Sequence, residues 1–185
     1  MITKEYADAN YNVSHAAGSV IETFSLVANN SSVTVQSGTY SISNVIAPQN
    51  LSSDYADVQG SRITYTPPSN ATSVVYEYDY SLSSGDTRPH INFDLYFDGN
   101  EVSKARHTQI PYYDSRHTFR WVFRIGGTAD TSVGQVGSWT SGKVIKLRAR
   151  EHSDSYEGKL HNQYHRSGAA QNNLSLPVLT ITAIA

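Results

Sequence analysis

The chain has 185 residues, of which 38% are hydrophobic and 16% charged, with a formal net charge of −2 and no cysteine. This length fits one domain with a sizeable core, whereas the weak acidic charge argues against nucleic-acid binding. The lack of cysteine excludes disulfides and thiolate metal ligands, and no segment approaches the roughly 20 apolar residues of a membrane span.

The N-terminal residues 1–17 show no regular hydrophobic period, so they predict an arm, and they lack the apolar core of a signal peptide. From residue 18 to residue 185 the sequence alternates with a period of two, which indicates strands of one domain. Strands are predicted over residues 20–26, 32–35, 39–45, 62–66, 73–82, 90–97, 101–106, 117–125, 143–150 and 176–184. Among the turns between them, Asp98-Gly99 is the strongest hairpin signal.

The alternation places apolar side chains on one face of several predicted strands. The three clearest apolar faces are Ile91/Phe93/Leu95/Phe97, Phe119/Trp121/Phe123/Ile125 and Ile145/Leu147/Ala149. A strand with one apolar face packs that face against a second sheet. About ten such strands without a long helix predict an all-β fold, a two-sheet antiparallel jelly-roll sandwich.

The segment 151–173 is polar, carries three histidines and lacks strand alternation, so it is expected to be a long excursion between the last two strands. No HExxH motif and no cysteine partner accompanies the histidines, so no metal site is predicted. If a metal were bound, His161 and His165 would be the first pair to consider.

No catalytic or cofactor-binding residue is assigned. The sequence has no GxSxG nucleophile elbow and no phosphate-binding glycine loop. Glu77, Asp79 and Asp94 could in principle act as glycosidase carboxylates, but carboxylates on outer strand faces are more often solvated or paired with arginine. The chain is therefore expected not to be an enzyme.

Basic residues on two predicted strands would form one cluster if those strands were neighbours. These residues are Arg116, Arg120, Arg124, Lys146, Arg148 and Arg150. The cluster could contact an anion, a glycan or a partner, or it could be a charged outer face neutralised by Glu77, Asp79 and Asp94. Because like charges that face one another are destabilising, some acidic partner must lie among them.

Tyr76, Tyr78 and Tyr80 share one face of the strand over residues 73–82, directly after a Pro-Pro turn. Three aromatic rings in register are too large a patch for a monomer to leave exposed. Phenylalanine or leucine would suit a dry core better, since each buried hydroxyl needs a partner. The stripe therefore predicts either the margin of the core or an oligomer interface.

Several segments resemble a group of virion structural proteins of tailed bacteriophages, especially those of marine bacteria. The similar segments are GSVI (residues 18–21), SVTVQSGTYSISNV (32–45), YADVQGSRITYTPP (55–68), the tyrosine stripe and LPVLTITAIA (176–185). They cover most of the chain from residue 18 onward, and they are structural rather than catalytic motifs.

The resemblance implies a jelly roll of the tumour necrosis factor type that assembles as a homotrimer on the virion, as a capsid decoration, cement protein or head fibre. Its partners would be further copies of the chain and the major capsid protein or other virion proteins. Because no coiled coil or β-helical shaft precedes the domain, a compact protein that docks through its arm is expected. Tyr6, Tyr11 and Val13 are the anchors expected in that arm.

Within this hypothesis, Tyr76, Tyr78 and Tyr80 are expected to be buried against a neighbour, either the facing sheet or, more specifically, the threefold axis of a trimer. The alternative function is a receptor-binding or glycan-binding fibre tip. In that case the aromatic loop residues would stack on sugar rings; they are Tyr112, Tyr113, Tyr156 and Tyr164. A third hypothesis is a hydrolase of host polysaccharide that uses the carboxylates of the outer sheet.

Overall fold

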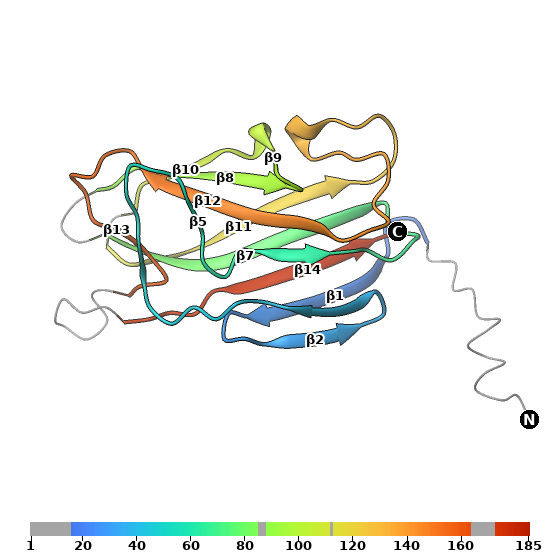
Figure 1. Ribbon diagram of the computed structural model, residues 1–185, viewed down its shortest axis with the longest axis horizontal. Coiled ribbons are helices and arrows are strands. Elements are labelled where there is room, and N and C mark those ends of the chain that lie inside the picture. Colours follow the sequence, from blue (N-terminus) through green and yellow to red (C-terminus); the bar gives the residue numbers. More distant parts are fainter. Residues whose placement is uncertain (1–15, 85–87, 112, 164–172) are drawn as a thin grey trace, which may run out of the picture.

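A computed structural model describes residues 16–84, 88–111, 113–163 and 173–185. These residues form two antiparallel sheets that pack face to face, with the C-terminus at one end of the sandwich (Figure 1). The prediction of an all-β, jelly-roll-like sandwich is confirmed. Of the predicted arm, only residues 16 and 17 lie within the described part of the chain.

Sheet 1 is built around its longest strand, β7 (Ser73–Ser84). On one side, β7 pairs with β14 (Val178–Ile184) and, further along, with β13 (Gly158–Leu160); on the other side it pairs with β11 (Ser115–Arg124). The sheet continues to β1 (Val20–Val27) beyond β14 and to β4 (Gln49–Asn50) beyond β13. Within the described residues, β11 pairs with no other strand and is therefore an edge strand.

Sheet 2 is built around β12 (Lys143–Glu151), which pairs along its length with β8 (Ile91–Phe97). On its other side β12 pairs with β5 (Ala56–Asp57) and β6 (Ile63–Tyr65), while β8 pairs with β9 (Asn100–Glu101) and β10 (His107–Gln109). A separate hairpin is formed by β2 (Ser32–Val35) and β3 (Gly38–Ser41). Two 3-10 turns, η1 (Ser103–Ala105) and η2 (Thr131–Val133), complete the described elements.

Two predicted connections can now be judged. The Asp98-Gly99 hairpin is confirmed, since both residues have positive φ and Phe97 pairs with Asn100. The predicted strand over residues 101–106 is wrong, because β9 ends at Glu101 and η1 follows it. The expected excursion over residues 151–173 contains β13, which is too short and too polar for its alternation to show in the sequence.

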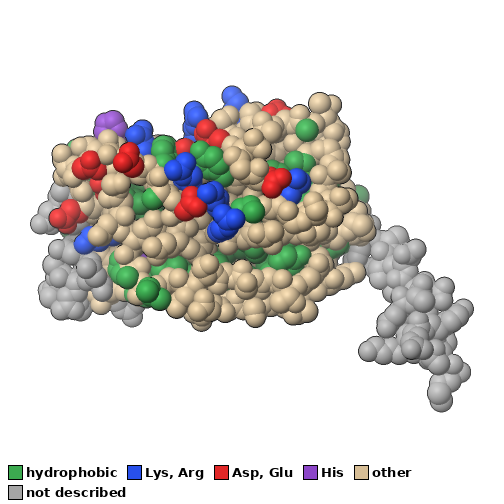
Figure 2. Space-filling view, viewed as in Figure 1, with side chains coloured by type: hydrophobic (Ala, Val, Ile, Leu, Met, Phe, Trp, Pro, Cys, Tyr) green, Lys and Arg blue, Asp and Glu red, His purple; other side chains and the backbone are tan. Residues whose placement is uncertain are grey.

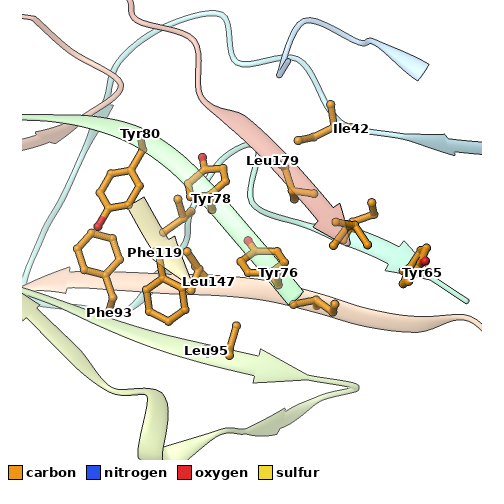
Figure 3. Packing of buried hydrophobic residues seen from close by; sticks show 14 of the residues in the cluster. Ile42, Tyr65, Tyr76, Tyr78, Tyr80, Phe93, Leu95, Phe119, Leu147 and Leu179 are labelled. Carbon is orange, nitrogen blue, oxygen red and sulfur yellow. The ribbon is translucent and has the colours of Figure 1, made fainter. Parts of the chain in front are cut away.

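The core lies between the two sheets and has the predicted alternation. Sheet 2 contributes Ile91, Phe93, Leu95, Ile145 and Leu147, all 0% exposed. Figure 3 shows aromatic rings from β7 and β11 facing aliphatic and phenylalanine side chains from β8 and β12. Each fully buried aromatic or large aliphatic side chain contributes on the order of 2 kcal/mol at roughly 25 cal/mol per Å² of apolar surface, so this layer provides most of the stabilisation.

Membrane insertion through a helix has no support in the described part of the chain, where no helix is long and apolar enough to cross a bilayer.

Candidate functional surfaces

The tyrosine stripe belongs to the core of the single chain. Tyr76, Tyr78 and Tyr80 are 0–1% exposed, and Tyr80 packs against Phe93 of the opposite sheet with ring centroids 5.2 Å apart. A side chain without accessible surface in one chain offers nothing to another subunit. The assignment of these three residues to a trimer axis is therefore corrected, and the facing sheet is the neighbour.

Two of the tyrosine hydroxyls explain why phenylalanine does not occupy these positions. The Tyr76 hydroxyl donates to the carbonyl oxygen of Ser61 at 2.7 Å, and the Tyr78 hydroxyl donates to that of Gln59 at 2.6 Å. Both acceptors lie in the connection between β5 and β6, the strands that pair with β12 in sheet 2. The stripe of sheet 1 is thus hydrogen-bonded across the core to the margin of sheet 2, and burial raises the pKa of both phenols well above the ordinary value.

The connection that receives these bonds contains the most distinctive motif of the sequence, residues 55–68. Ser61 joins this segment to sheet 2, since its hydroxyl accepts from the Leu147 N–H at 3.1 Å. Gly60 has φ +73°, and a Cβ there would lie 2.9 Å from Ala28 Cβ and 3.0 Å from Val45 Cγ2. Only glycine combines this conformation with such a close approach. The motif is therefore a folding element rather than a binding loop.

A second buried polar group, not anticipated from the sequence, lies at the other end of the core. The Glu22 carboxylate accepts hydrogen bonds from the Ser37 N–H (2.9 Å), the Ser37 hydroxyl (2.6 Å) and the Tyr65 hydroxyl (2.7 Å). Burial and the neighbouring Glu22 raise the Tyr65 pKa above its ordinary value. Three donors satisfy this carboxylate, so its role is to join β1, the β2–β3 hairpin and β6.

Two buried titratable side chains are incompletely satisfied. Glu151 at the end of β12 accepts from the Gly158 N–H through Oε1, while Oε2 has no partner among the described residues. Burial raises the Glu151 pKa to about 7. No well-formed hydrogen bond reaches either ring nitrogen of His161 within the described chain. Burial lowers the His161 pKa to about 4, against a weaker opposite effect of the Gln59 backbone.

The histidines do not assemble a metal site within the described residues, where no group of three metal-ligating side chains occurs. His161 is 0% exposed, and its ring lies edge-on to Tyr78. It is therefore a core residue rather than the loop residue expected from the sequence. Its predicted companion, His165, lies outside the described residues.

The aromatic loop residues of the fibre-tip hypothesis are partly visible. Tyr113 and Tyr156 are 44% and 37% exposed. Both lie at the end of the sandwich where β11 begins and β12 ends (Figure 1). Tyr112 and Tyr164 lie outside the described residues, as do the arm residues Tyr6, Tyr11 and Val13.

The predicted basic cluster is divided between two surfaces. β11 belongs to sheet 1 and β12 to sheet 2, so Arg116, Arg120 and Arg124 lie on the opposite side of the sandwich from Lys146 and Arg148. The candidate carboxylates are separated in the same way, with Glu77 and Asp79 on sheet 1 and Asp94 on sheet 2. A carboxylate pair drawn from both sheets therefore cannot act on one bond.

The outer face of sheet 2, here the charged face, pairs its cations within the chain. Lys146 Nζ lies 2.7 Å and Arg148 Nε 3.6 Å from the Asp57 carboxylate. At the start of β12, on the side of Ile145 and Leu147, Lys143 Nζ lies 2.9 Å from the Asp98 carboxylate. The guanidiniums of Arg148 and Arg150 also stack on the Tyr55 ring, at 5.7 and 5.0 Å. In Figure 2, basic side chains lie beside acidic ones over the part of the molecule that holds β8 and β12.

The outer face of sheet 1, here the hydroxyl face, is built from cross-strand rungs of small polar and apolar side chains. Thr23 bonds Thr182 at 3.0 Å, and Ser25 bonds Thr180 at 2.7 Å. Val27 and Val122 are 38% and 44% exposed at its two edges. Its charges lie on β7 and β11, where the guanidinium of Arg120 is 3.4 Å from the Glu77 carboxylate and the Thr118 hydroxyl donates to Asp79.

The fold and these surfaces define a two-sheet antiparallel sandwich of the jelly-roll class. No family model matches the chain, and no curated protein matches its sequence. Among solved structures, it is similar to those of infectious bursal disease virus Gx strain (12% identity, TM-score 0.40, 91% of this chain and 38% of that chain) and Gt strain (11%, 0.39, 92% and 39%). It is also similar to the VP2 subviral particle of that virus (12%, 0.28, 94% and 49%).

The chain spans less than half the length of each of these viral chains. Identities of 11–12% and TM-scores of 0.28–0.40 are too low to place it in their family.

Proposed function

We propose that the protein is a non-enzymatic structural component of a bacteriophage virion, a homotrimeric jelly roll that decorates or cements the capsid or forms a head fibre. The observation that carries the proposal is the β1–β14 part of the hydroxyl face, whose outward residues include no charged side chain, since subunit interfaces are depleted in charge at their centre. The resemblance of the sequence motifs to virion proteins supplies the location. Partners would be other copies of the chain and the major capsid protein.

The hydroxyl face replaces the tyrosine stripe as the proposed subunit contact. The rungs between β1 and β14 carry threonine and serine hydroxyls that already bond one another, so a second subunit could cover them without leaving these oxygen atoms unpaired. The exposed Val27 would add apolar area at the β1 edge of this face.

Light scattering after size exclusion tests the assembly. A trimer has three times the mass of the 20.4 kDa chain, about 61 kDa. Thr23→Lys places a charge on a hydroxyl rung between β1 and β14 and should reduce the mass to that of one chain. Thr34→Lys is the matched control, because Thr34 is also exposed and bonds Thr39 across the β2–β3 hairpin at 2.9 Å. A wild-type mass near 20 kDa at micromolar concentration would contradict the trimer.

The location on the particle is tested separately, by labelling purified virions with an antibody against the chain. Label over the whole capsid supports a decoration or cement protein, and label at a few discrete points supports a head fibre. Particles without label would refute the virion role, whatever the oligomeric state.

The fibre-tip function remains the second candidate, because Tyr113 and Tyr156 expose aromatic surface at one end of the sandwich. Host-surface glycans would be the ligands. A glycan array should then give signals that the double variant Tyr113→Ser/Tyr156→Ser loses. An array without signal, combined with tight binding to undecorated capsids, would decide for the decoration role.

A further inference from the structure

The edge of β11 that faces away from β7 leaves backbone groups unpaired. The Ile125 N–H donates to Thr72 at 2.8 Å, toward β7, so the alternate residues Arg116, Thr118, Arg120 and Val122 direct their N–H and C=O groups outward. The loop after β11 closes only the end of this edge, where the Val136 N–H donates to the Arg124 carbonyl at 3.0 Å. No described strand pairs with the remainder.

Two hollows flank this edge and share Arg120 and Trp121. One, of about 650 Å³, lies between β11 and the η2 turn and is lined by Arg120, Trp121, Val122, Arg124, Val133 and Gln135. The other, of about 310 Å³, lies between β11 and the η1–β10 segment, including Lys104 and His107. These two adjoining hollows beside the unpaired backbone are together called the edge groove.

The edge groove is basic. Its lining includes Lys104, Arg106, Arg120 and Arg124 and no Asp or Glu. Arg106 is paired with Glu101, and the 62%-exposed Arg120 is only loosely paired with Glu77. Arg124 makes no ion pair within the described chain, and Lys104 forms no salt bridge there but lies near Asp130, whose pKa it helps to lower. The lining of the groove therefore carries more positive than negative charge, with Arg124 as the cation that has no ion pair in the described chain.

A second copy of β11 is a poor occupant of this edge. In any register a second β11 strand brings three arginines and no Asp or Glu to this edge. In the register centred on Arg120, antiparallel pairing would place Arg120 against Arg120 and Arg116 against Arg124. Like charges in directly opposed pairs are destabilising. An acidic strand meets the same backbone with complementary charge. Its carboxylates would lie on the face of Arg120 and Arg124, and its apolar side chains would lie on the opposite face, beside the half-buried Trp121.

We propose that the edge groove binds an extended acidic segment of a partner protein, which adds to sheet 1 as a strand alongside β11. The partner backbone pairs with the outward groups of residues 116–122, and its carboxylates contact Arg120, Arg124 and Lys104. This goes beyond the proposed virion role, and it holds whether or not copies of the chain form a trimer.

The test uses fluorescence anisotropy with labelled peptides and the full chain. The probe is an eight-residue peptide of alternating Glu and Val, and the controls are the same peptide with alternate backbone nitrogens methylated and a Lys-Val peptide. Strand addition predicts that the Glu-Val peptide binds at least tenfold tighter than either control. It also predicts that the affinity falls as salt rises.

Variants locate the binding. Arg120→Glu/Arg124→Glu should weaken binding of the Glu-Val peptide at least tenfold, whereas Lys146→Glu/Arg148→Glu on the charged face should leave it within about twofold. Val122→Pro removes a backbone N–H that points outward and makes no hydrogen bond to β7. This variant should also weaken binding of the Glu-Val peptide. Circular dichroism tests whether each variant is folded. If Val122→Pro is unfolded, the methylated peptide still tests the backbone contact on the wild-type chain.

Three results would overturn the proposal. If the methylated peptide binds as tightly as the unmethylated Glu-Val peptide, charge attraction alone accounts for binding and no strand is added. Competition by dextran sulfate together with tighter binding of that polymer than of any peptide would assign the groove to an anionic polysaccharide. Absence of binding at low salt would mean that the arginines only protect an open sheet edge.

Discussion

The two sheets differ in where their polar side chains find partners: sheet 2 pairs them on its outer face, and sheet 1 pairs several of them inside the core. Sheet 2 has an almost entirely apolar inner face, and its ion pairs around Asp57 lie outside. Sheet 1 places tyrosine hydroxyls inside, bonded to Ser61 and Gln59, and carries few charges outside apart from the arginines of β11. The number of charges on a strand is thus a poor guide to an interaction surface, because what matters is whether the chain already pairs them.

Gly60→Val should break the contact between the sheets and give the largest effect. The new side chain would meet Ala28, Val45 and Pro177 at 2.9–3.2 Å, at a φ of +73° that valine rarely adopts. We expect a loss of more than about 3 kcal/mol in the free energy of unfolding in urea. The control is Gly99→Ala, at φ +85° with no atom within 4 Å, which should cost only about 1 kcal/mol. Equal losses would refute the steric role of Gly60.

Tyr76→Phe and Tyr80→Phe separate the cross-sheet hydrogen bond from ring packing. Tyr76→Phe removes the bond to Ser61 and should cost about 1–2 kcal/mol in the free energy of unfolding. Tyr80→Phe removes a buried hydroxyl that has no partner among the described residues, so stability should stay constant or rise. A larger loss for Tyr80→Phe than for Tyr76→Phe would contradict this view of sheet 1.

Glu151 and His161 are the titratable exceptions inside the two sheets, and they act oppositely on stability. The Glu151 pKa is raised from 4.5 to about 7, so the folded chain holds a proton that the unfolded chain loses, and this contribution falls as pH rises from about 4.5 to 7. The His161 pKa is lowered from 6.5 to about 4, so the unfolded chain binds the extra proton, and this contribution is lost as pH falls from about 6.5 to 4.

Removing either titratable group should therefore leave the pH dependence of stability that the other one causes. In chemical denaturation across pH 4–8, Glu151→Gln should make stability rise more steeply with pH between 4 and 6.5, and it should increase stability at pH 8 by on the order of 1 kcal/mol. His161→Asn should make stability fall more steeply between pH 4.5 and 7; asparagine tolerates the φ of +61°. Unchanged slopes in both variants would disprove the assignment.

Asp57→Asn should have the smallest effect on the free energy of unfolding, but it should free the cations of the charged face to bind ligands. Asp57 pairs with both Lys146 and Arg148 and is half-exposed, so its loss should cost no more than about 1 kcal/mol. The released cations should give the charged face a measurable affinity for the Glu-Val peptide. If the variant gains no binding, the ion pairs with Asp57 are not what prevents the charged face from binding the peptide.

Some residues were predictable because their environment follows from local pattern. Phe93 and Ile145 alternate with polar residues, and the hydrophobic effect places such residues inside whatever the topology. The Asp98-Gly99 turn was predictable because few residue pairs accept its φ values. Glu22 was not, because its three donors come from Ser37 and Tyr65, 15 and 43 residues away in the chain.

The sequence by itself determined the all-β class, most long strands and the burial of Tyr76, Tyr78 and Tyr80 against a neighbour, since alternation and aromatic area depend only on nearby residues. The tertiary structure alone decided which neighbour that is, how Ser61 and Gln59 receive two of the hydroxyls, and that β11 and β12 lie in different sheets. Strand order brings together residues far apart in the chain, and a period of two within one strand carries no information about that order.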